Sequence, residues 1–322
     1  MADIVALGEL LVDFVPDRAG VTLGEADRFL KAAGGAPANV AVGVRRLELE
    51  ASFVGKVGDD PFGRWLVGIL EADGVDVHDV RFEAAARTAL AFVSLAASGE
   101  RDFMFYRHPS ADQLHRPDEL DLDAIRAARV LHHGSISLIQ EPSRSATLAA
   151  IAAASAADVR VSYDPNLRLP LWPSAEAARE GILSAWSTAN LIKVSEEELA
   201  FLTGSEELAA AEDLMHDALE LLVVTLGAKG VAWFALGRTG MVPGFEVQAV
   251  DTTGAGDAFV AALLAAWCRN LRPDGSTLMD DEMALSGALR EANAYAALTT
   301  TRKGAIPALP TRTELRAFLA SS

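Results

Sequence analysis

The chain has 322 residues, of which 51% are hydrophobic and 7% aromatic, a composition typical of a globular enzyme and not of a disordered chain. Its formal net charge of −17 disfavours a nucleic-acid partner, because an acidic surface repels a phosphate backbone. With a single cysteine, Cys268, no basic leader and no apolar run long enough to cross a bilayer, we expect a cytoplasmic protein without a membrane partner.

Short apolar segments alternate with helical patterns along most of the chain. This alternation predicts an α/β fold with a largely parallel central sheet that is covered by helices on both faces. The expected strands are residues 4–7, 52–55, 130–132, 160–163, 190–193 and 221–224. The expected helices are residues 37–47, 61–72, 142–157, 174–187, 196–203, 257–270 and 281–299.

Two insertions, at about residues 11–33 and 87–108, interrupt the alternation because their strand patterns have no helix between them. We expect these strands to pair as a small separate sheet. The strands are predicted at 11–15, 27–32, 89–95 and 102–107, with a turn at Ser98-Gly99 between the last two. The length suits one large domain or two smaller ones, and the absence of a long linker favours a single domain over residues 1–322.

A glycine-rich run at residues 251–260 contains the groups needed to move a phosphoryl group onto an alcohol. Gly254 and Gly256 allow a tight turn with converging N–H groups, and the apolar residues that follow predict a helix whose N-terminus points at the turn. Such a turn binds anions, and the carboxylate of Asp257 at its mouth could accept a hydroxyl proton. The alternative is an ordinary helix cap, because Asp is a preferred capping residue.

A second glycine turn, Gly34-Gly35-Ala36-Pro37-Ala38-Asn39, lies more than two hundred residues upstream. Its glycine pair allows a ligand to approach the backbone closely, and Pro37 begins a helix whose first turn carries the amide of Asn39. The alternative is a tight entry into a helix with no ligand.

Together the two turns resemble those of the ribokinase-like, PfkB-type family of carbohydrate kinases, and the resemblance covers nearly the whole chain. Residues 8–13, 105–112, 133–139 and 162–173 are similar to fructokinases in particular. The resemblance implies a ribokinase-like fold with a small β-sheet lid, which in this family often pairs in a homodimer. It also implies phosphoryl transfer from ATP to D-fructose, giving fructose 6-phosphate and ADP.

The resemblance assigns roles to the residues that match the family. Asp257 would be the catalytic base, and the N–H groups of Gly254, Ala255, Gly256 and Asp257 would hold the γ-phosphoryl group. Arg168 would reach the transferred phosphate on the substrate side, unless it forms a surface ion pair. The residues implied around the sugar are Asp13, Gly34, Gly35, Asn39, Tyr106 and Arg107, the last two being alternatively a strand edge or a subunit contact. The residues implied on the nucleotide side are Lys193, Thr225, Gly227, Gly254, Gly256 and Asn293.

Metal sites are also implied, with one departure from the family pattern. The usual Asn-x-x-Glu is replaced by Ser195-Glu-Glu-Glu198, which is equally a capping box. Glu198 would organise water bound to Mg²⁺. A K⁺ ion would lie near Asp251 and the Thr253 carbonyl, where they meet the 301–305 loop, although Asp251 could also be an ordinary hydrogen-bonded residue at a strand end.

Other functions remain open at this point. A 2-keto-3-deoxygluconate kinase, or another sugar or nucleoside kinase of the same family, is an alternative because Tyr106 and Arg107 could recognise a carboxylate. A dinucleotide-dependent oxidoreductase is disfavoured, because Phe259 occupies the place of the third glycine of its motif. A non-catalytic sugar-binding regulator is disfavoured by the presence of Asp257 with both glycines.

Overall fold

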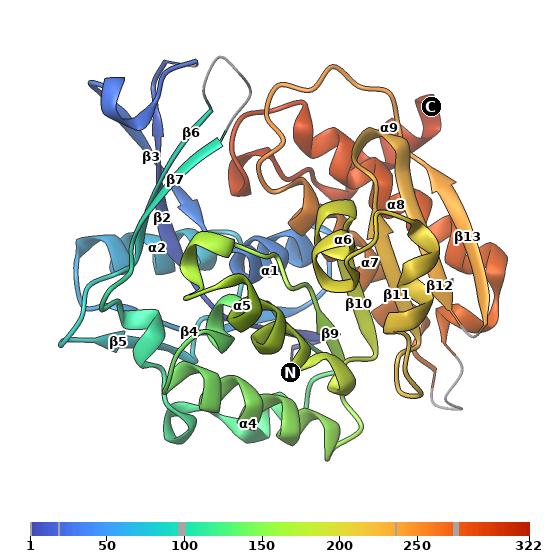
Figure 1. Cartoon of the computed structure of the whole chain (residues 1–322), viewed down its shortest axis with the longest axis horizontal. Coiled ribbons are helices and arrows are strands. Elements are labelled where there is room, and N and C mark those ends of the chain that lie inside the picture. Colours follow the sequence, from blue (N-terminus) through green and yellow to red (C-terminus); the bar gives the residue numbers. More distant parts are fainter. Residues whose placement is uncertain (1, 19, 96–100, 236, 273–276) are drawn as a thin grey trace.

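Two separate sheets form the framework of the protein (Figure 1). The computed structural model describes residues 2–18, 20–95, 101–235, 237–272 and 277–322. Within these residues the larger sheet has nine strands in the order β13-β12-β11-β10-β9-β8-β1-β4-β5. The strands are β1 (Ile4–Leu7), β4 (Ala51–Gly58), β5 (Val80–Glu83), β8 (Val130–His133), β9 (Arg160–Tyr163), β10 (Leu191–Ser195), β11 (Leu221–Thr225), β12 (Gly230–Ala235) and β13 (Arg238–Pro243).

Seven adjacent strands of this sheet run parallel to one another, in the spatial order β11-β10-β9-β8-β1-β4-β5. Strands β12 and β13 form an antiparallel edge beside β11. The central strand β1 lies between β4 and β8, with Ile4 opposite Ala51 on one side and Val130 on the other. All of β1 is buried, as expected for a parallel strand whose two faces are covered. The predicted largely parallel α/β sheet is therefore confirmed.

Helices cover both faces of the larger sheet. Along β1, Ile4 and Ala6 belong to one apolar cluster with α1, α2, α7 and α8, whereas Val5 and Leu7 belong to a second cluster with α4, α5 and α6. The helices are α1 (Ala36–Arg46), α2 (Pro61–Ala72), α3 (Leu122–Arg126), α4 (Ser143–Ser155), α5 (Ala175–Leu183), α6 (Glu196–Thr203), α7 (Ala255–Asn270), α8 (Glu282–Thr300) and α9 (Arg312–Ser321). Among the described residues, no helix is both long and apolar enough to span a membrane.

The smaller sheet projects from the larger one (Figure 1). Its strands are β2 (Leu11–Pro16), β3 (Phe29–Gly34), β6 (Leu90–Leu95) and β7 (Arg101–Tyr106), in the order β3-β2-β6-β7. Aromatic contacts stiffen it, since the rings of Phe14 and Phe92 stack at 5.0 Å. The expected small sheet made by the two insertions is confirmed, and the turn predicted at Ser98-Gly99 lies outside the described residues.

Several elements differ from the sequence prediction. Strand β3 begins two residues later than expected, and α5 ends at Leu183 instead of 187. Strands β5, β12 and β13 and helices α3 and α9 were not predicted. Edge strand β13 alternates exposed and half-buried residues over most of its length, so it lacks the apolar run that identifies the central strands.

Candidate active site

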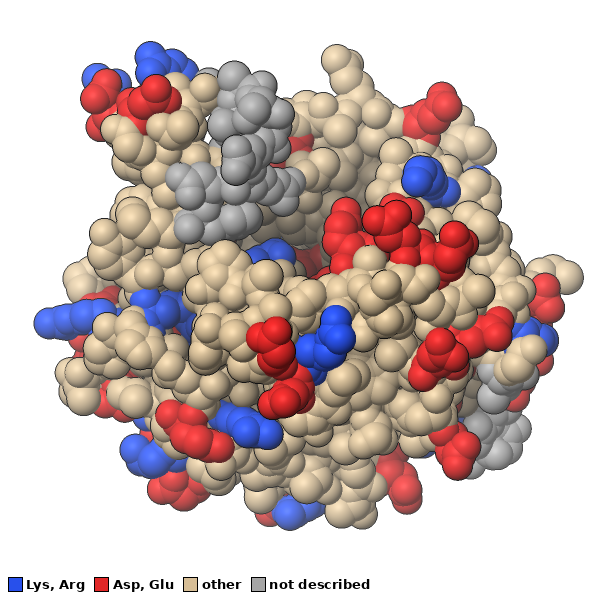
Figure 2. Space-filling model, in the orientation of Figure 1, with Lys and Arg blue, Asp and Glu red and all other residues tan. Residues whose placement is uncertain are grey.

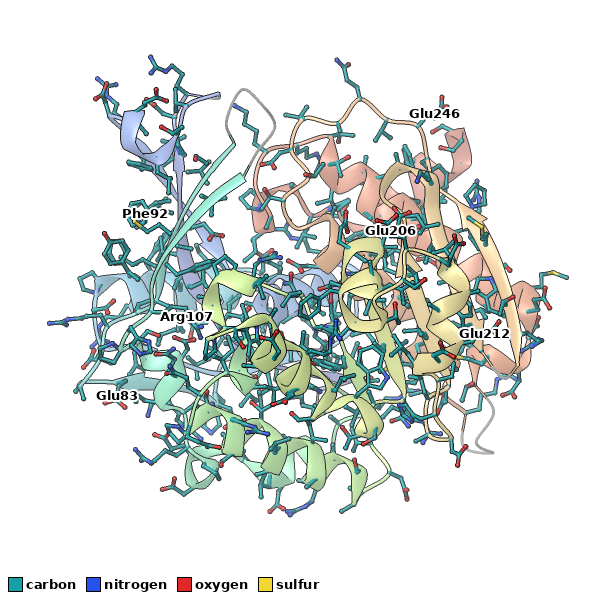
Figure 3. The ribbon with its side chains drawn as sticks, in the orientation of Figure 1. Glu83, Phe92, Arg107, Glu206, Glu212 and Glu246 are labelled. Carbon is teal, nitrogen blue, oxygen red and sulfur yellow. The ribbon has the colours of Figure 1, made fainter. Side chains whose placement is uncertain are left out.

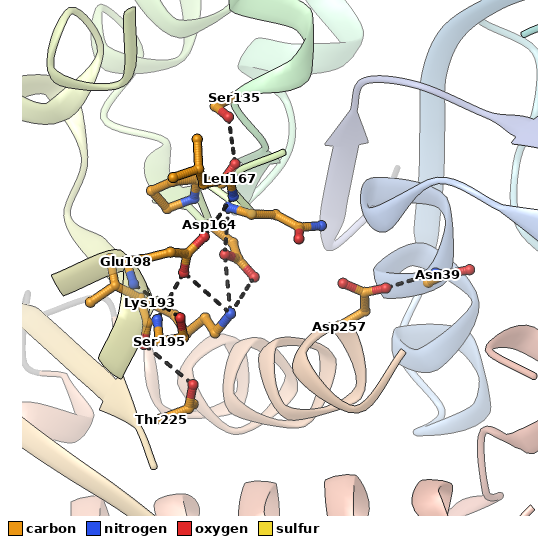
Figure 4. Close-up of polar contacts among 12 residues, drawn as sticks. Asn39, Ser135, Asp164, Leu167, Lys193, Ser195, Glu198, Thr225 and Asp257 are labelled. Atoms are coloured by element: carbon orange, nitrogen blue, oxygen red, sulfur yellow. Dashed lines mark hydrogen bonds and ion pairs between the residues drawn. The ribbon is translucent and has the colours of Figure 1, made fainter. Parts of the chain in front are cut away.

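The two glycine turns meet at the start of two neighbouring helices. Asn39 lies in the first turn of α1 and Asp257 in the first turn of α7, 218 residues apart in sequence. The Asn39 Nδ2 donates a hydrogen bond to Asp257 Oδ2 at 2.7 Å (Figure 4). Both side chains are buried. The fold thus brings the Asn39 amide, from the glycine turn at residues 34–39, into direct contact with the Asp257 carboxylate, from the run at residues 251–260.

The turn before α7 has the conformation that its glycines allow. Gly254 is the N-cap residue, with a left-handed φ of 76°, and a Cβ placed there would lie 2.8 Å from the Cβ of Ala305. The N–H of Ala255 donates to the Thr252 carbonyl at 3.3 Å. The N–H groups of Gly256 and Asp257 have no acceptor within their own helix, because these residues lie in its first turn. This helix terminus favours an anion.

Charged groups around Asp257 set its protonation. Burial raises the pKa of the Asp257 carboxyl, and the hydrogen bond from Asn39 opposes this rise, as do the positive charges of Lys193 and Arg168. Two cations and one amide therefore stabilise the ionised form, which is the form a general base needs.

Asp13, on β2, lies beside the glycine turn that contains Gly34 and Gly35. Burial and the charge of Asp257 raise the pKa of the Asp13 carboxyl to about 7, with Arg168 opposing the rise. A side chain at Gly34 would overlap the Asp13 carboxylate, and one at Gly35, where φ is 111°, would overlap the Glu9 carbonyl. The glycine pair is therefore required for the chain to turn this close to Asp13.

A buried ion pair also lies near the first turn of α7. Lys193, in the middle of β10, places its Nζ 3.2 and 3.3 Å from the two carboxylate oxygens of Asp164, which directly follows β9 (Figure 4). A Cβ placed at Gly256 would lie 3.3 Å from Lys193 Nζ, so the ammonium group lies against the first turn of α7. Burial lowers the pKa of Lys193, but the carboxylates of Asp164, Glu198 and Asp257 outweigh it and raise the pKa, so the ammonium group is charged.

The surface is hollowed between the smaller sheet and the body of the protein (Figure 2). In a parallel sheet, ligands bind outside the carboxyl ends of the strands, which is where β9, β10 and the two glycine turns present these polar groups. The geometry thus combines a carboxylate base, a helix N-terminus and a buried cation, which is the set needed for phosphoryl transfer.

Comparison with known proteins decides the family. The profile described as pfkB family carbohydrate kinase matches residues 1–312. The chain belongs to this family. It is 56% identical to a probable fructokinase-4 of Arabidopsis thaliana over 318 residues, covering 98% of this chain and 96% of the relative.

Solved structures agree with this membership. A fructokinase with bound ATP from Xylella fastidiosa superposes with a TM-score of 0.90 at 34% identity, covering 100% of this chain and 99% of the other. A double mutant of the Vibrio cholerae fructokinase, described with fructose, ADP and potassium ion bound, has a TM-score of 0.87 at 38% identity, covering 99% and 98%. The carbohydrate kinase fold is therefore shared over the full length, which excludes the oxidoreductase alternative.

Glu198 of this kinase forms the capping box that its sequence allows. The Glu198 Oε2 accepts from the Ser195 N–H at 2.8 Å, and the Ser195 Oγ accepts from the Glu198 N–H at 3.2 Å. The Oε1 accepts from the Leu167 N–H at 2.6 Å. Each oxygen thus already accepts one hydrogen bond and keeps a further lone pair, with which it could accept from metal-bound water.

Asp251 contacts the loop near which the cation was expected. Its Oδ1 accepts from the N–H and hydroxyl of Thr253 at 2.9 and 2.7 Å, and its Oδ2 accepts from the Gly304 N–H at 2.9 Å. Both carboxylate oxygens thus accept hydrogen bonds from the chain itself, and a K⁺ site at Asp251 stays a prediction. Among the described residues, no group of three or more His, Cys, Asp or Glu side chains is clustered as a metal site.

Three of the predicted nucleotide-side residues lie at the end of β11, just after it, or on α8. The Thr225 hydroxyl, at the end of β11, donates to the Val194 carbonyl at 3.3 Å. Gly227 begins the next turn with a positive φ of 57°. Asn293, on α8, donates to the carbonyls of Val242 and Pro243 at 3.1 Å each, so its amide ties α8 to the end of β13.

Tyr106 and Arg107 were expected either beside the sugar or at a strand edge or subunit contact, and Tyr106 is the last residue of the edge strand β7. Tyr106 is 58% exposed and packs edge-on against Phe92 at 5.6 Å on the smaller sheet. Arg107 is buried at the base of that sheet (Figure 3), where its guanidinium pairs with Asp112. The ion pair accounts for the burial of Arg107 without a ligand, and a contact with the sugar stays a prediction.

Asp164 received no role from the sequence analysis, although it lies within a segment that resembles the family. Its position after strand β9 was the available signal, because polar residues at the carboxyl ends of parallel strands converge on one edge. Only the fold shows that it pairs with Lys193, which is 29 residues away in the chain.

Proposed function

We propose that this carbohydrate kinase transfers the γ-phosphoryl group of ATP to a primary hydroxyl of D-fructose, giving fructose 6-phosphate and ADP. The observation that carries the proposal is the contact between Asn39 and Asp257, which places the sugar-side turn against a carboxylate at a helix N-terminus. The choice of fructose rests on the similarity to fructokinases at 56% identity over 98% of the chain.

In the proposed reaction, Asp257 accepts the proton of the sugar hydroxyl as its oxygen attacks the γ-phosphorus. A new oxygen–phosphorus bond forms while the bond to the β-phosphate oxygen breaks, and ADP leaves. The N-terminus of α7, with Gly254, Ala255 and Gly256, and the ammonium group of Lys193 stabilise the negative charge on the transferred group.

On the sugar side, we assign Asp13, the turn at Gly34 and Gly35, and Asn39 to the fructose hydroxyls. Arg168 interacts electrostatically with both Asp13 and Asp257, so it is suited to the phosphate as it passes to the sugar. Tyr106 and Arg107 would border the sugar only through the smaller sheet that carries them.

On the nucleotide side, Thr225, Gly227 and Asn293 would line the site of ATP, since Thr225 ends β11, Gly227 follows it, and Asn293 lies on α8, which packs against β12 and β13. Bound Mg²⁺ would neutralise phosphate charge, with Glu198 holding one of its waters. A K⁺ ion would bind near Asp251 and the Thr253 carbonyl and keep the turn before α7 in place.

The smaller sheet is suited to act as a lid and a dimer contact within a single domain over residues 1–322. Among the described side chains of this sheet, Val15 and Leu30 pair across β2 and β3 and are 42% and 64% exposed on one face, whereas Met104 and Tyr106 are 42% and 58% exposed on the other. Exposed apolar patches are typical of interaction sites. We therefore propose a cytoplasmic homodimer that pairs through this sheet, which light scattering of wild type and Leu30→Glu would test.

The central experiment compares wild type with Asp257→Asn in a coupled assay of ADP release. The substitution keeps the shape of the side chain and removes the base, so kcat should fall by about 10²- to 10⁴-fold while fructose binding, measured by calorimetry, persists. A kcat near that of wild type would contradict the assignment of the base.

The same assay with fructose, ribose, 2-keto-3-deoxygluconate and adenosine tests the substrate. We expect the highest kcat/KM for fructose. A higher value for 2-keto-3-deoxygluconate would replace the fructose assignment with the alternative kinase and keep the role of Asp257.

A further inference from the structure

Helices α1 and α7 also lie in close contact one turn beyond the active site. Gly43 follows Asn39 by four residues on α1, and Ala261 follows Asp257 by four residues on α7, so each pair shares one face of its helix. A Cβ placed at Gly43 would lie 2.6 Å from the Cβ of Ala261. Since carbon atoms pack at about 3.5–4.0 Å, the space between the helices excludes even one methyl group at this position.

The junction leaves no room for α1 to yield sideways. The ring of Tyr295, on α8, lies 3.7 Å from the same position at Gly43. Its hydroxyl donates to the Pro310 carbonyl at 2.8 Å and lies 3.5 Å from the Gly43 carbonyl. All residues of α7 from Asp257 to Cys268 are buried, so that helix is held on every side. A methyl group at Gly43 would therefore separate the axes of α1 and α7.

We infer that Gly43 and Ala261 are positioning residues, whose contact sets the spacing of α1 and α7 and thereby the reach from Asn39 to Asp257. The inference rests on the proposed role of Asp257 as the base. Restoring an ordinary carbon–carbon contact would need a separation of about 1 Å. The distance between Asn39 Nδ2 and Asp257 Oδ2 is 2.7 Å, and an increase of about 1 Å would take it beyond the usual range of a hydrogen bond.

The spacing also controls the base electrostatically. The hydrogen bond from Asn39 lowers the pKa of Asp257, together with Lys193 and Arg168, whereas burial raises it. The carboxylates of Asp13 and Asp164 also interact with Asp257. Loosening the Asn39 contact removes one stabilising group from the ionised base, so the acidic limb of the kcat profile should move to higher pH.

Four variants test the inference, and none of them alters a group that touches a substrate. Gly43→Ala adds a methyl group on α1, and Ala261→Gly removes the opposing methyl group on α7. The double variant, called the exchange variant, moves the one methyl group from α7 to α1. Gly68→Ala is the matched control, since Gly68 is exposed on α2 and a Cβ placed there would have no atom within 4 Å. For each we would measure kcat, KM for both substrates, the pH profile and the melting temperature.

We expect Gly43→Ala to lower kcat by about 10- to 100-fold, because a displacement of about 1 Å at a reacting group costs this much. The KM for ATP should stay within about twofold and the acidic limb should shift upward, as helix spacing and not nucleotide binding is changed. The exchange variant should recover most of kcat and the wild-type profile, and Gly68→Ala should behave as wild type.

Two results would overturn the inference. One is a Gly43→Ala protein with the kcat and pH profile of wild type. The other, decisive if Gly43→Ala does not fold, is an exchange variant that melts like wild type and yet has not recovered kcat. Failure of the proposed function is distinguishable, since wild type would then not phosphorylate fructose, or Asp257→Asn would keep its kcat.

Discussion

Replacing Gly254 by alanine tests whether the turn before α7 must have its observed shape. Gly254 has φ 76° and ψ 2°, a left-handed conformation that side chains disfavour. The new Cβ would lie 2.8 Å from the Cβ of Ala305 and 3.0 Å from its Cα. The substitution therefore introduces both backbone strain and a collision with the neighbouring loop.

The two effects differ in magnitude and in consequence. The left-handed conformation costs about 1–2 kcal/mol for a residue with a side chain, and overpacking adds about 1–3 kcal/mol. The free energy of unfolding should thus fall by about 2–5 kcal/mol. If the turn moves to relieve the collision, the N–H groups at the start of α7 move too, and the loss of one such donor lowers kcat by about 10²- to 10³-fold.

Gly204→Ala provides a matched control. Gly204 ends α6 with φ 77° and ψ 11°, nearly the conformation of Gly254, but a Cβ there would meet no atom within 4 Å. It should lose only about 1–2 kcal/mol of stability in urea unfolding and keep its kcat for ADP release with fructose. Equal stability losses in the two variants, with kcat unchanged in Gly254→Ala, would refute the reasoning.

Two further predictions follow from the buried charges. The pKa of Asp13 is raised to about 7, so the native state holds this proton more tightly than the unfolded state, and stability falls as the pH rises from about 4 to 7. Asp13→Asn should flatten this decline, by at most about 3 kcal/mol between pH 5 and pH 8 in urea unfolding, and an unchanged decline would count against it. Lys193→Met leaves Asp164 buried without its cation, so it should destabilise the protein by about 3–5 kcal/mol and lower kcat with ATP. Pairing it with Asp164→Asn should restore stability without restoring kcat; restored kcat would show that Lys193 acts only through Asp164.

Local signals in the chain predicted much of the framework. Helices α2 and α6 and strands β1 and β9 have the predicted bounds, because periodicity, prolines and capping residues act over a few neighbouring positions. The capping box at Ser195 and Glu198 is likewise local, and it formed as the spacing indicated. The tight turn expected at Gly254 is also present, with the glycine in a left-handed conformation.

The geometry and the charges of the site depend on packing between segments that are distant in the sequence. Residue patterns alone place a glycine turn before each of two helices, but only the order of the strands brings Asn39 and Asp257 within 2.7 Å across 218 residues. The raised pKa of Asp13, the pair of Lys193 with Asp164 and the close approach at Gly43 depend on burial between elements distant in the chain. Helices and turns are stabilised by neighbours in sequence, whereas the distances and charges of the site are set by side chains that meet only after the sheet has formed.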